Sequence, residues 1–196
     1  MFVQVIEGRT NDPAAIAEQG ERWQRELRPG AVGFLGVTAG VTADGRSITI
    51  ARFEDEEAAR ANAGRPEQTA WFETMAKLYD GPPTFSESTD VTEWLGGGSD
   101  DARFVQVMKF SGVDRAEMER MDAAFEPFAG QRADLLGGVR IWTGPDACFD
   151  VAYFTSEADA RTGEQAEVPE EMRELMAGFQ DLGEPEYLDL TEPHLH

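Results

Sequence analysis

The sequence predicts an α+β protein made of two copies of one module, each with the element order β-α-β-β-α-β. Three observations lead to this prediction. Similar segments recur in the same order at a nearly constant offset, strand-like and helix-like periodicities alternate in the same way in both halves, and a glycine-rich stretch separates the halves.

The repeat is clearest in the strand-like segments, where the offset is 102 residues, as from Phe2 to Phe104. Because order and spacing are kept across the whole unit, a duplicated module explains the pattern better than chance does. The matched segments are 2–5 with 104–107, 34–37 with 136–139 and, after one deleted loop residue, 50–53 with 151–154.

The boundary between the copies is a run of three glycines followed by serine and two aspartates. Such a stretch is flexible and polar and has no side chains to pack, so it reads as a linker. We therefore expect one module over residues 1–95, a linker over 96–102 and a second module over 103–196.

Each element of the first copy follows from local signals. Alternating apolar residues, an Asn-Asp-Pro helix start, an Asp-Gly hairpin turn and a Gly-Pro-Pro break place the elements along the chain. The expected elements are a strand at 2–7, a helix from 13 to about 27, a hairpin of strands 33–42 and 46–53, helices at 54–62 and 66–79, and a last strand at 84–91.

This order is the ferredoxin-like arrangement, with its second helix split in two. One such module has helices on only one face of its sheet, so the other face needs a partner. Two fused modules carry that partner within one chain, at a high effective concentration. We therefore expect two ferredoxin-like modules that form an intramolecular pseudo-dimeric α/β barrel.

Composition limits the classes of function. The formal net charge of -21 repels phosphate backbones and anionic headgroups, so we expect no nucleic-acid partner and no membrane partner. No signal peptide is visible, and Cys148 is the only cysteine, which fits a cytoplasmic protein. We expect a monomeric pseudo-dimer and leave a further homodimer open.

Several segments carry a resemblance to a known group: the strand 2–6, the strand 33–36, the strand-to-helix passage 51–58, and the helix with Trp71 and Phe72 that leads to Gly81-Pro82 and Phe85. The chain resembles the dimeric α/β-barrel superfamily and, within it, the antibiotic-biosynthesis-monooxygenase-like (ABM) domains. The resemblance covers each copy nearly end to end. The family includes enzymes for cofactor-free oxygenation of aromatic polyketides, haem degradation and quinol oxidation, and it has members without an assigned activity. The resemblance implies this range of functions and does not choose among them.

The haem-degrading branch of that family implies an iron-ligating histidine on the helix after the third strand and an asparagine just after the first strand. Here the helix has Trp71 and Phe72, its counterpart has Met172 and Leu175, and the asparagine position holds Gly8 or Phe110. The only histidines are His194 and His196. We therefore expect no haem, no histidine-ligated metal and no other cofactor.

Two polar pairs stand at repeated positions and are candidates for lining a pocket. Gln4 and Gln106 lie mid-strand, where an unpaired buried amide would cost about 1–3 kcal/mol. A structural hydrogen bond is the favoured reading for them. Arg52 and Tyr153 share one position and would suit a phenolate or oxyanion, or would be ordinary strand residues.

The remaining candidates are aromatic. Trp71 and Phe72 lie on the helix that lines the pocket in the family the chain resembles, and Trp142 is aligned with Gly40 at the 102-residue offset. Each could stack on a flat ligand, although a core role is the more common use of tryptophan. Because the copies differ here, we expect any functional pocket in one copy, with the first favoured.

Two functions remain open from the sequence. One is a cofactor-independent monooxygenase-like enzyme that acts on an aromatic small molecule and supplies a dry pocket and an oxyanion partner. The other is a non-catalytic small-molecule-binding or interaction protein on the same scaffold. No catalytic residue is assigned, since no nucleophile motif, phosphate loop or metal motif is present.

Overall fold

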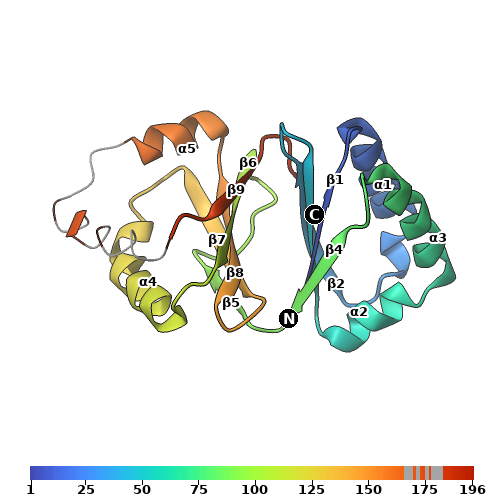
Figure 1. The fold of residues 1–196 in the computed structure, drawn as a ribbon, viewed down its shortest axis with the longest axis horizontal. Coiled ribbons are helices and arrows are strands. Elements are labelled where there is room, and N and C mark those ends of the chain that lie inside the picture. Colours follow the sequence, from blue (N-terminus) through green and yellow to red (C-terminus); the bar gives the residue numbers. More distant parts are fainter. Residues whose placement is uncertain (166–169, 171–172, 175–176, 178–182) are drawn as a thin grey trace. The chain divides into compact units, whose positions relative to one another are not determined.

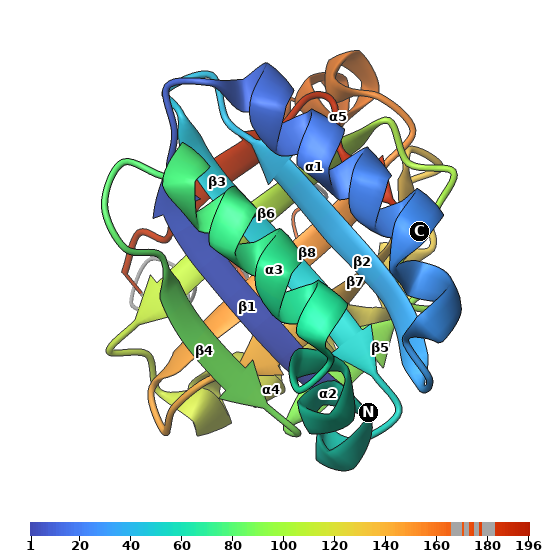
Figure 2. The same ribbon diagram turned by 90° about the vertical axis from the view of Figure 1, so that its right-hand side faces the viewer.

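The computed structural model describes residues 1–165, 170, 173–174, 177 and 183–196. The chain divides into two compact units. Unit 1 comprises Met1–Val91 with Glu192–His196, and unit 2 comprises Thr92–Thr191. Each unit has one five-stranded sheet, and helices lie against one face of it (Figures 1 and 2). This is the α+β, ferredoxin-like architecture that the sequence predicts, present twice.

Unit 1 has the strand order β10-β2-β3-β1-β4. Its β1/β3, β1/β4, β2/β3 and β10/β2 pairs are all antiparallel. Its elements are β1 (Phe2–Arg9), α1 (Pro13–Glu26), β2 (Phe34–Val41), β3 (Arg46–Phe53), α2 (Glu56–Ala63), α3 (Pro66–Met75) with a 3-10 turn at Ala76–Leu78, β4 (Thr84–Ser88) and β10 (His194–Leu195).

Unit 2 has the strand order β5-β7-β8-β6-β9. Its elements are β5 (Val91–Trp94), β6 (Phe104–Ser111), α4 (Arg115–Ala129), β7 (Leu135–Trp142), β8 (Ala147–Phe154), α5 (Glu157–Glu164) and β9 (Glu186–Leu190). The residues expected to form its second long helix, including Met172, Leu175, Met176 and Phe179, lie outside the described residues.

The single strand predicted at 84–91 is wrong, because the chain forms two strands there. The Ser88 hydroxyl accepts a hydrogen bond from the backbone N–H of Asp90 at 2.9 Å, and this local turn ends β4. The chain resumes as β5, which pairs with β7 of unit 2, while β10 at the other end of the sequence pairs with β2 of unit 1. The last strand of each repeat thus completes the sheet of the other unit.

The strand register also corrects the alignment of the repeats. A bulge lies between Phe34 and Gly36 in β2 and between Leu135 and Gly137 in β7, an offset of 101 rather than 102. The deleted residue therefore precedes this strand instead of following it. Trp142 corresponds to Val41, so its alignment with Gly40 is wrong, because Val41 pairs with Ser47 as Trp142 pairs with Cys148.

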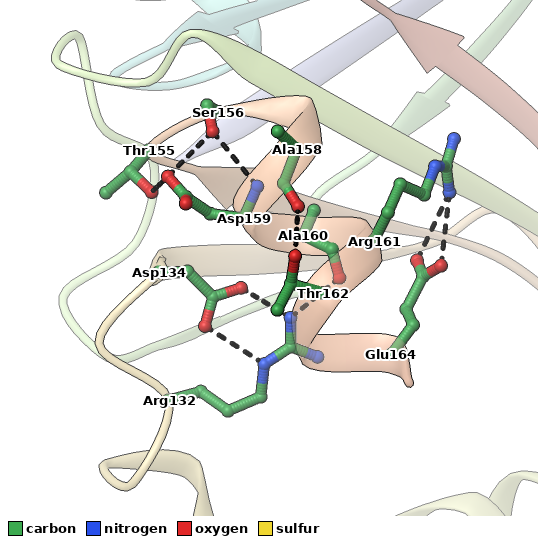
Figure 3. A network of polar contacts seen from close by, with 10 residues as sticks. All are labelled: Arg132, Asp134, Thr155, Ser156, Ala158, Asp159, Ala160, Arg161, Thr162 and Glu164. Atoms are coloured by element: carbon green, nitrogen blue, oxygen red, sulfur yellow. Dashed lines mark hydrogen bonds and ion pairs between the residues drawn. The ribbon is translucent and has the colours of Figure 1, made fainter. Parts of the chain in front are cut away.

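Local capping explains where the helices start. Asp12, Asp55 and Ser156 occupy the N-cap positions of α1, α2 and α5, and each side chain accepts a backbone N–H. In unit 2 the guanidinium of Arg132 binds Asp134, at 2.5 Å from Nη2 to Oδ2, and donates to the carbonyl of Ala160 in α5 (Figure 3). These contacts fix α5 beside the loop before β7 and are structural.

Candidate functional site

The helix-covered face of the unit 1 sheet is composed of three rows of side chains that the strand register brings together. On this face α1 and α3 run side by side (Figure 2). The rows are Val37–Ala51–Gln4–Glu87, Ala39–Thr49–Ile6–Phe85 and Val41–Ser47–Gly8, each read from β2 through β3 to β1 and, in the first two, on to β4.

The corresponding rows of unit 2 carry larger or charged side chains. They are Gly138–Ala152–Gln106–Asp189, Arg140–Asp150–Met108–Tyr187 and Trp142–Cys148–Phe110. In unit 2 the β7 and β8 members of these rows are all buried. In unit 1 five of the six counterparts, Val37, Ala39, Val41, Thr49 and Ala51, are only partly buried, and the sixth, Ser47, is buried.

An ion-paired arginine fills the centre of unit 2. Arg140 binds Asp150 through Nε at 2.6 Å and through Nη2 at 2.7 Å, and its Nη1 binds Asp122 from α4. Arg140 and Asp150 are 9% and 7% exposed. Burial raises the pKa of Asp122, whose side chain remains half exposed. Every nitrogen of the guanidinium has a carboxylate partner, so Arg140 is neutralised by acidic side chains of its own unit.

The third row of unit 2 is an apolar core. Trp142 is 4% exposed and packs with Phe110, Cys148 and Met118, and the guanidinium of Arg115 lies 4.7 Å from its ring. The tryptophan is thus enclosed by side chains of its own unit. The sequence left open whether Trp142 stacks on a ligand or belongs to the core, and its buried position matches the core role.

In unit 1 the tryptophans connect the two helices. Trp23 of α1 donates its indole N–H to the side chain of Gln68 at 2.6 Å, and Trp71 of α3 donates to the backbone carbonyl of Gln19 at 2.9 Å. The two rings meet edge to face, with centroids 6.5 Å apart. Trp71 is only partly buried, so part of its ring surface remains free for contact.

Phe72 continues the aromatic surface toward the sheet edge. Its ring lies 5.7 Å from that of Phe85 on β4, and Phe85 is 52% exposed. Trp71 and Phe72 are adjacent rings 6.4 Å apart. An aromatic strip therefore runs from α1, across α3, to the exposed edge of the unit 1 sheet.

A partly buried phenol, that of Tyr79, lies at the other end of this face. The ring of Tyr79 packs on the backbone of Gly8, where a Cβ would lie 2.5 Å from the ring, so only glycine leaves it room. Its hydroxyl is hydrogen-bonded to Ser47, and burial raises the pKa of the phenol. At neutral pH the phenol is therefore protonated and able to donate.

Gln4 and Gln106 form matching contacts in the two units. Gln4 donates to Glu87 at 2.8 Å, Gln106 donates to Asp189 at 3.0 Å, and both carboxylates are also ion-paired to an arginine on a helix, α2 in unit 1 and α5 in unit 2. Those arginines are Arg60 and Arg161, which also lie over the rings of Phe2 and Phe104. Both amides are thus occupied in binding helices α2 and α5 to the sheet.

Arg52 and Tyr153 share one position, as predicted, but they do not lie with Trp71. Arg52 pairs with Val3 and Gly36, and Tyr153 pairs with Val105 and Gly137. Because directly paired residues share a face, both lie on the side of the sheet opposite the helices. Arg52 therefore does not share a face of the sheet with the helix that carries Trp71.

The metal and cofactor expectations stay predictions. Within the described ranges there is no group of three or more His, Cys, Asp or Glu side chains suited to a metal ion. His194 lies in β10, paired with Ala39, far in sequence from the helix that would carry an iron ligand. No described helix is long and apolar enough to cross a membrane.

Sequence reasoning left out two groups that the structure brings forward. One is Tyr79, whose hydroxyl is hydrogen-bonded to Ser47. The pairing of Arg140 with Asp150 was not recognised, although an arginine and an aspartate in facing positions of a predicted hairpin are a detectable signal.

No protein-family model matches the sequence, and a search of curated proteins finds no match. Solved structures do match. A candidate monooxygenase from Lactobacillus acidophilus has a TM-score of 0.71 at 12% identity and covers 100% of this chain and 99% of its own. A candidate monooxygenase from Fusobacterium nucleatum has a TM-score of 0.76 at 10% identity, covering 100% and 93%.

An anthrone oxidase-like protein has a TM-score of 0.64 at 12% identity and covers 100% of this chain and 92% of its own. These neighbours share the fold of this chain, which contains two ferredoxin-like modules. The chain is similar to monooxygenase-like proteins over its whole length, and identities this low establish the fold alone.

Proposed function

We propose that the protein is a cofactor-independent monooxygenase that binds a flat aromatic small molecule on the helix-covered face of unit 1. The observation that carries the proposal is the contrast between the two units at equivalent positions. Unit 1 has Ala39, Val41 and Thr49, all partly exposed, where unit 2 has Arg140, Trp142 and Asp150, all buried.

The surroundings of this face suit an aromatic ligand. Trp71, Phe72 and Phe85 provide ring surfaces along one side, and small apolar side chains form the floor. Small-molecule sites are typically lined in this way, with a few polar groups that fix orientation. Tyr79 is such a group, because its phenol is partly buried and protonated, and its ring packs on Gly8, one row away from Thr49 and Ile6.

The chemistry requires no group beyond dioxygen and the substrate. For an anthrone, the methylene carbon loses a proton to solvent and gives an enolate, which reduces O2 and forms a carbon–oxygen bond with it as a peroxide. The O–O bond then breaks as the second methylene hydrogen leaves as a proton, so that the ring carbon becomes a ketone and the outer oxygen leaves as water. One anthrone and one O2 give one anthraquinone and one water. Tyr79 would donate a hydrogen bond to the substrate oxygen and stabilise the negative charge that develops on it.

The structural neighbours share the fold of this chain, and their names suggest the substrate class to test. Two are candidate monooxygenases and one is anthrone oxidase-like, and all cover this chain end to end. Fold alone does not fix chemistry, so the proposal rests on the unit 1 face and uses the neighbours to choose the probe.

The test is oxygen uptake by chelator-treated protein in the presence of anthrone, with anthraquinone formation followed by absorbance. We expect uptake above the buffer rate with one O2 consumed per anthraquinone formed. Tyr79→Phe should lower kcat by about 100- to 1000-fold, the range found for removal of one oxyanion donor, with KM little changed. Tyr187→Phe is the matched control, since Tyr187 is an exposed tyrosine of unit 2.

A rate equal to that of buffer would refute catalysis on this substrate class. Binding of anthrone without uptake, lost in Trp71→Ala, would instead support the second function, a non-catalytic binder of aromatic molecules. Uptake that survives in Tyr79→Phe at the full rate would exclude Tyr79 as the oxyanion donor.

A further inference from the structure

Helix α1 of unit 1 and helix α4 of unit 2 are equivalent elements of the two repeats. Each starts after an aspartate, Asp12 or Asp114, whose carboxylate accepts a hydrogen bond from the backbone N–H three residues later. The repeat offset in these helices is therefore 102, and Gly20 of α1 corresponds to Asp122 of α4. The surroundings of the two positions can be compared directly.

Unit 2 fills the space between this helix position and the sheet with an ion pair. Asp122 binds Nη1 of Arg140, which stands in β7 at the place that Ala39 holds in β2. Unit 1 has only a glycine and an alanine at these two positions. A Cβ built on Gly20 would meet no described atom within 4 Å. The space that the ion pair fills in unit 2 is thus open at Gly20 in unit 1, and we call it the Gly20 gap.

A buried amide oxygen lies beside this gap. The backbone carbonyl of Gln19 accepts the indole N–H of Trp71 at 2.9 Å, so Gln19 is on the flank of α1 that meets α3. Its side-chain Oε1 is buried and has no hydrogen-bond partner among the described residues. The corresponding residue of unit 2 is Met121, which is 7% exposed and packs in one cluster with Trp142. An amide therefore stands in unit 1 where unit 2 has an apolar core side chain.

Gln19 and Tyr79 lie at the same end of the helix-covered face. The cluster that contains Met121 also contains Phe110, and Phe110 corresponds to Gly8 of unit 1. Tyr79 packs on Gly8. This end of the face therefore has a phenol that can donate a hydrogen bond and an amide oxygen that can accept one.

The chemistry of the buried oxygen limits what can satisfy it. A buried carbonyl oxygen without a partner destabilises the folded protein, and nearly all such groups in native structures are hydrogen-bonded. Only a donor can pair with it, and the open space beside Gln19 is the Gly20 gap. A hydroxyl group is favoured over an ammonium group, because a buried cation without a counter-ion is costly.

We propose that Gln19 is a specificity-determining residue of the aromatic site, and that it accepts a hydrogen bond from a hydroxyl group of a ligand that enters the Gly20 gap. The inference rests on the aromatic site of the proposed function and adds a second polar contact to it. Tyr79 donates to one oxygen of the ligand and Gln19 accepts from another, so the two contacts fix the orientation of the ring.

The experiment compares two probes by calorimetry, 2-naphthol and 2-methoxynaphthalene. They have the same ring system and the same oxygen position, but only 2-naphthol has a proton to donate. Both are stable in air, so binding is measured without turnover. We expect the native protein to bind 2-naphthol about tenfold more tightly, which is the net worth of one hydrogen bond.

Three variants separate the hydrogen bond from the shape of the site. Gln19→Met introduces the residue that unit 2 has and should bind the two probes equally. Gln24→Met is the matched control, because it also removes a buried, unpartnered side-chain oxygen of α1, about 140° around the helix from Gln19, and it should keep the preference. Gly20→Leu should lose binding of both probes without a lower Tm, since leucine is the better helix former.

The outcomes distinguish failure of this inference from failure of the aromatic site. Equal affinity of the native protein for the two probes would overturn the contact with Gln19 and leave the aromatic site in place. A preference that survives in Gln19→Met, or is lost only in Gln24→Met, would overturn it too. Unchanged binding in Gly20→Leu would show that the ligand does not enter the gap. Binding of neither probe, or binding unaffected by Trp71→Ala, would refute the aromatic site and this inference with it.

Discussion

Arg140 and Asp150 form a bidentate ion pair on the helix-covered face of unit 2, with nitrogen–oxygen distances of 2.6 and 2.7 Å. At the same places in the unit 1 sheet stand Ala39 and Thr49. The two repeats have kept one fold and acquired different interiors. In unit 2 these central positions hold large or charged buried side chains, and in unit 1 they hold smaller side chains that are partly exposed.

Removing one member of the buried pair should destabilise the protein strongly. Asp150→Ala leaves the Arg140 charge buried beside Asp122 alone, and we expect a loss of about 3–5 kcal/mol in the free energy of unfolding, measured by urea denaturation. Asp122→Ala is the control and should cost less, because its side chain is half exposed. Equal losses in the two variants would contradict this account.

The Glu87 ion pair should make stability depend on pH. Hydrogen bonding from Arg60 holds the pKa of Glu87 below its usual value, with Gln4 contributing. A depressed folded-state pKa gives stability that is present above the unfolded-state pKa, and that stability is lost as the pH falls through the folded-state pKa.

Glu87→Gln should therefore be less stable than the native protein at neutral pH, and the difference should shrink on acidification below about pH 4.5. Thermal unfolding at a series of pH values measures it. Glu73→Gln, on an exposed residue of α3, is the control and should follow the native curve. If the stability difference between Glu87→Gln and the native protein grew as the pH fell, the stabilising role assigned to ionised Glu87 would be wrong.

Cys148 should be inert in the folded protein. Burial, followed by the nearby charge of Asp150, raises the pKa of its thiol to about 12, and the side chain is 1% exposed. Because the thiolate is the reactive form, a disulfide reagent at pH 8 should label the protein only in urea. Fast stoichiometric labelling of the native protein would show that unit 2 opens readily or that the thiol is more exposed.

Substitution of the two tryptophans should separate binding from stability. Trp142→Ala empties a buried core position and should cost about 3–5 kcal/mol, whereas Trp71→Ala, at a partly exposed position, should cost less. Affinity for anthrone should fall at least tenfold in Trp71→Ala and stay near the native value in folded Trp142→Ala. Equal loss of anthrone affinity in both variants, or loss only in Trp142→Ala, would contradict binding of anthrone to unit 1.

Much of the fold could be predicted from sequence because its signals are local. The strand alternation after Met1, the Asp12 cap before Pro13 and the Asp44-Gly45 turn each fix an element without reference to the rest of the chain. The strand register was harder to predict. Leu136 and Gly137 match the first repeat almost equally well at either offset, and only the bulge in β7 decides between them.

The candidate site was predicted less well because its composition depends on which face a residue occupies. Gln4 and Arg52 both lie in strands of one sheet, yet the register places Gln4 opposite Ala51 and so puts Arg52 on the other side. The partners of Gln4 and Tyr79 are Glu87 and Ser47, which are distant in sequence. Nothing in the local pattern around either residue indicates these contacts.

The central claim is that aromatic ligands bind to unit 1, and the indole N–H resonances of the four tryptophans test it most directly. Trp23 and Trp71 belong to unit 1, and Trp94 and Trp142 belong to unit 2. In an NMR titration with anthrone under anaerobic conditions, we expect the resonances of Trp71 and Trp23 to shift saturably while those of Trp94 and Trp142 stay in place. A saturable shift of Trp142 with Trp71 unmoved, or no shift of any of the four, would contradict the account.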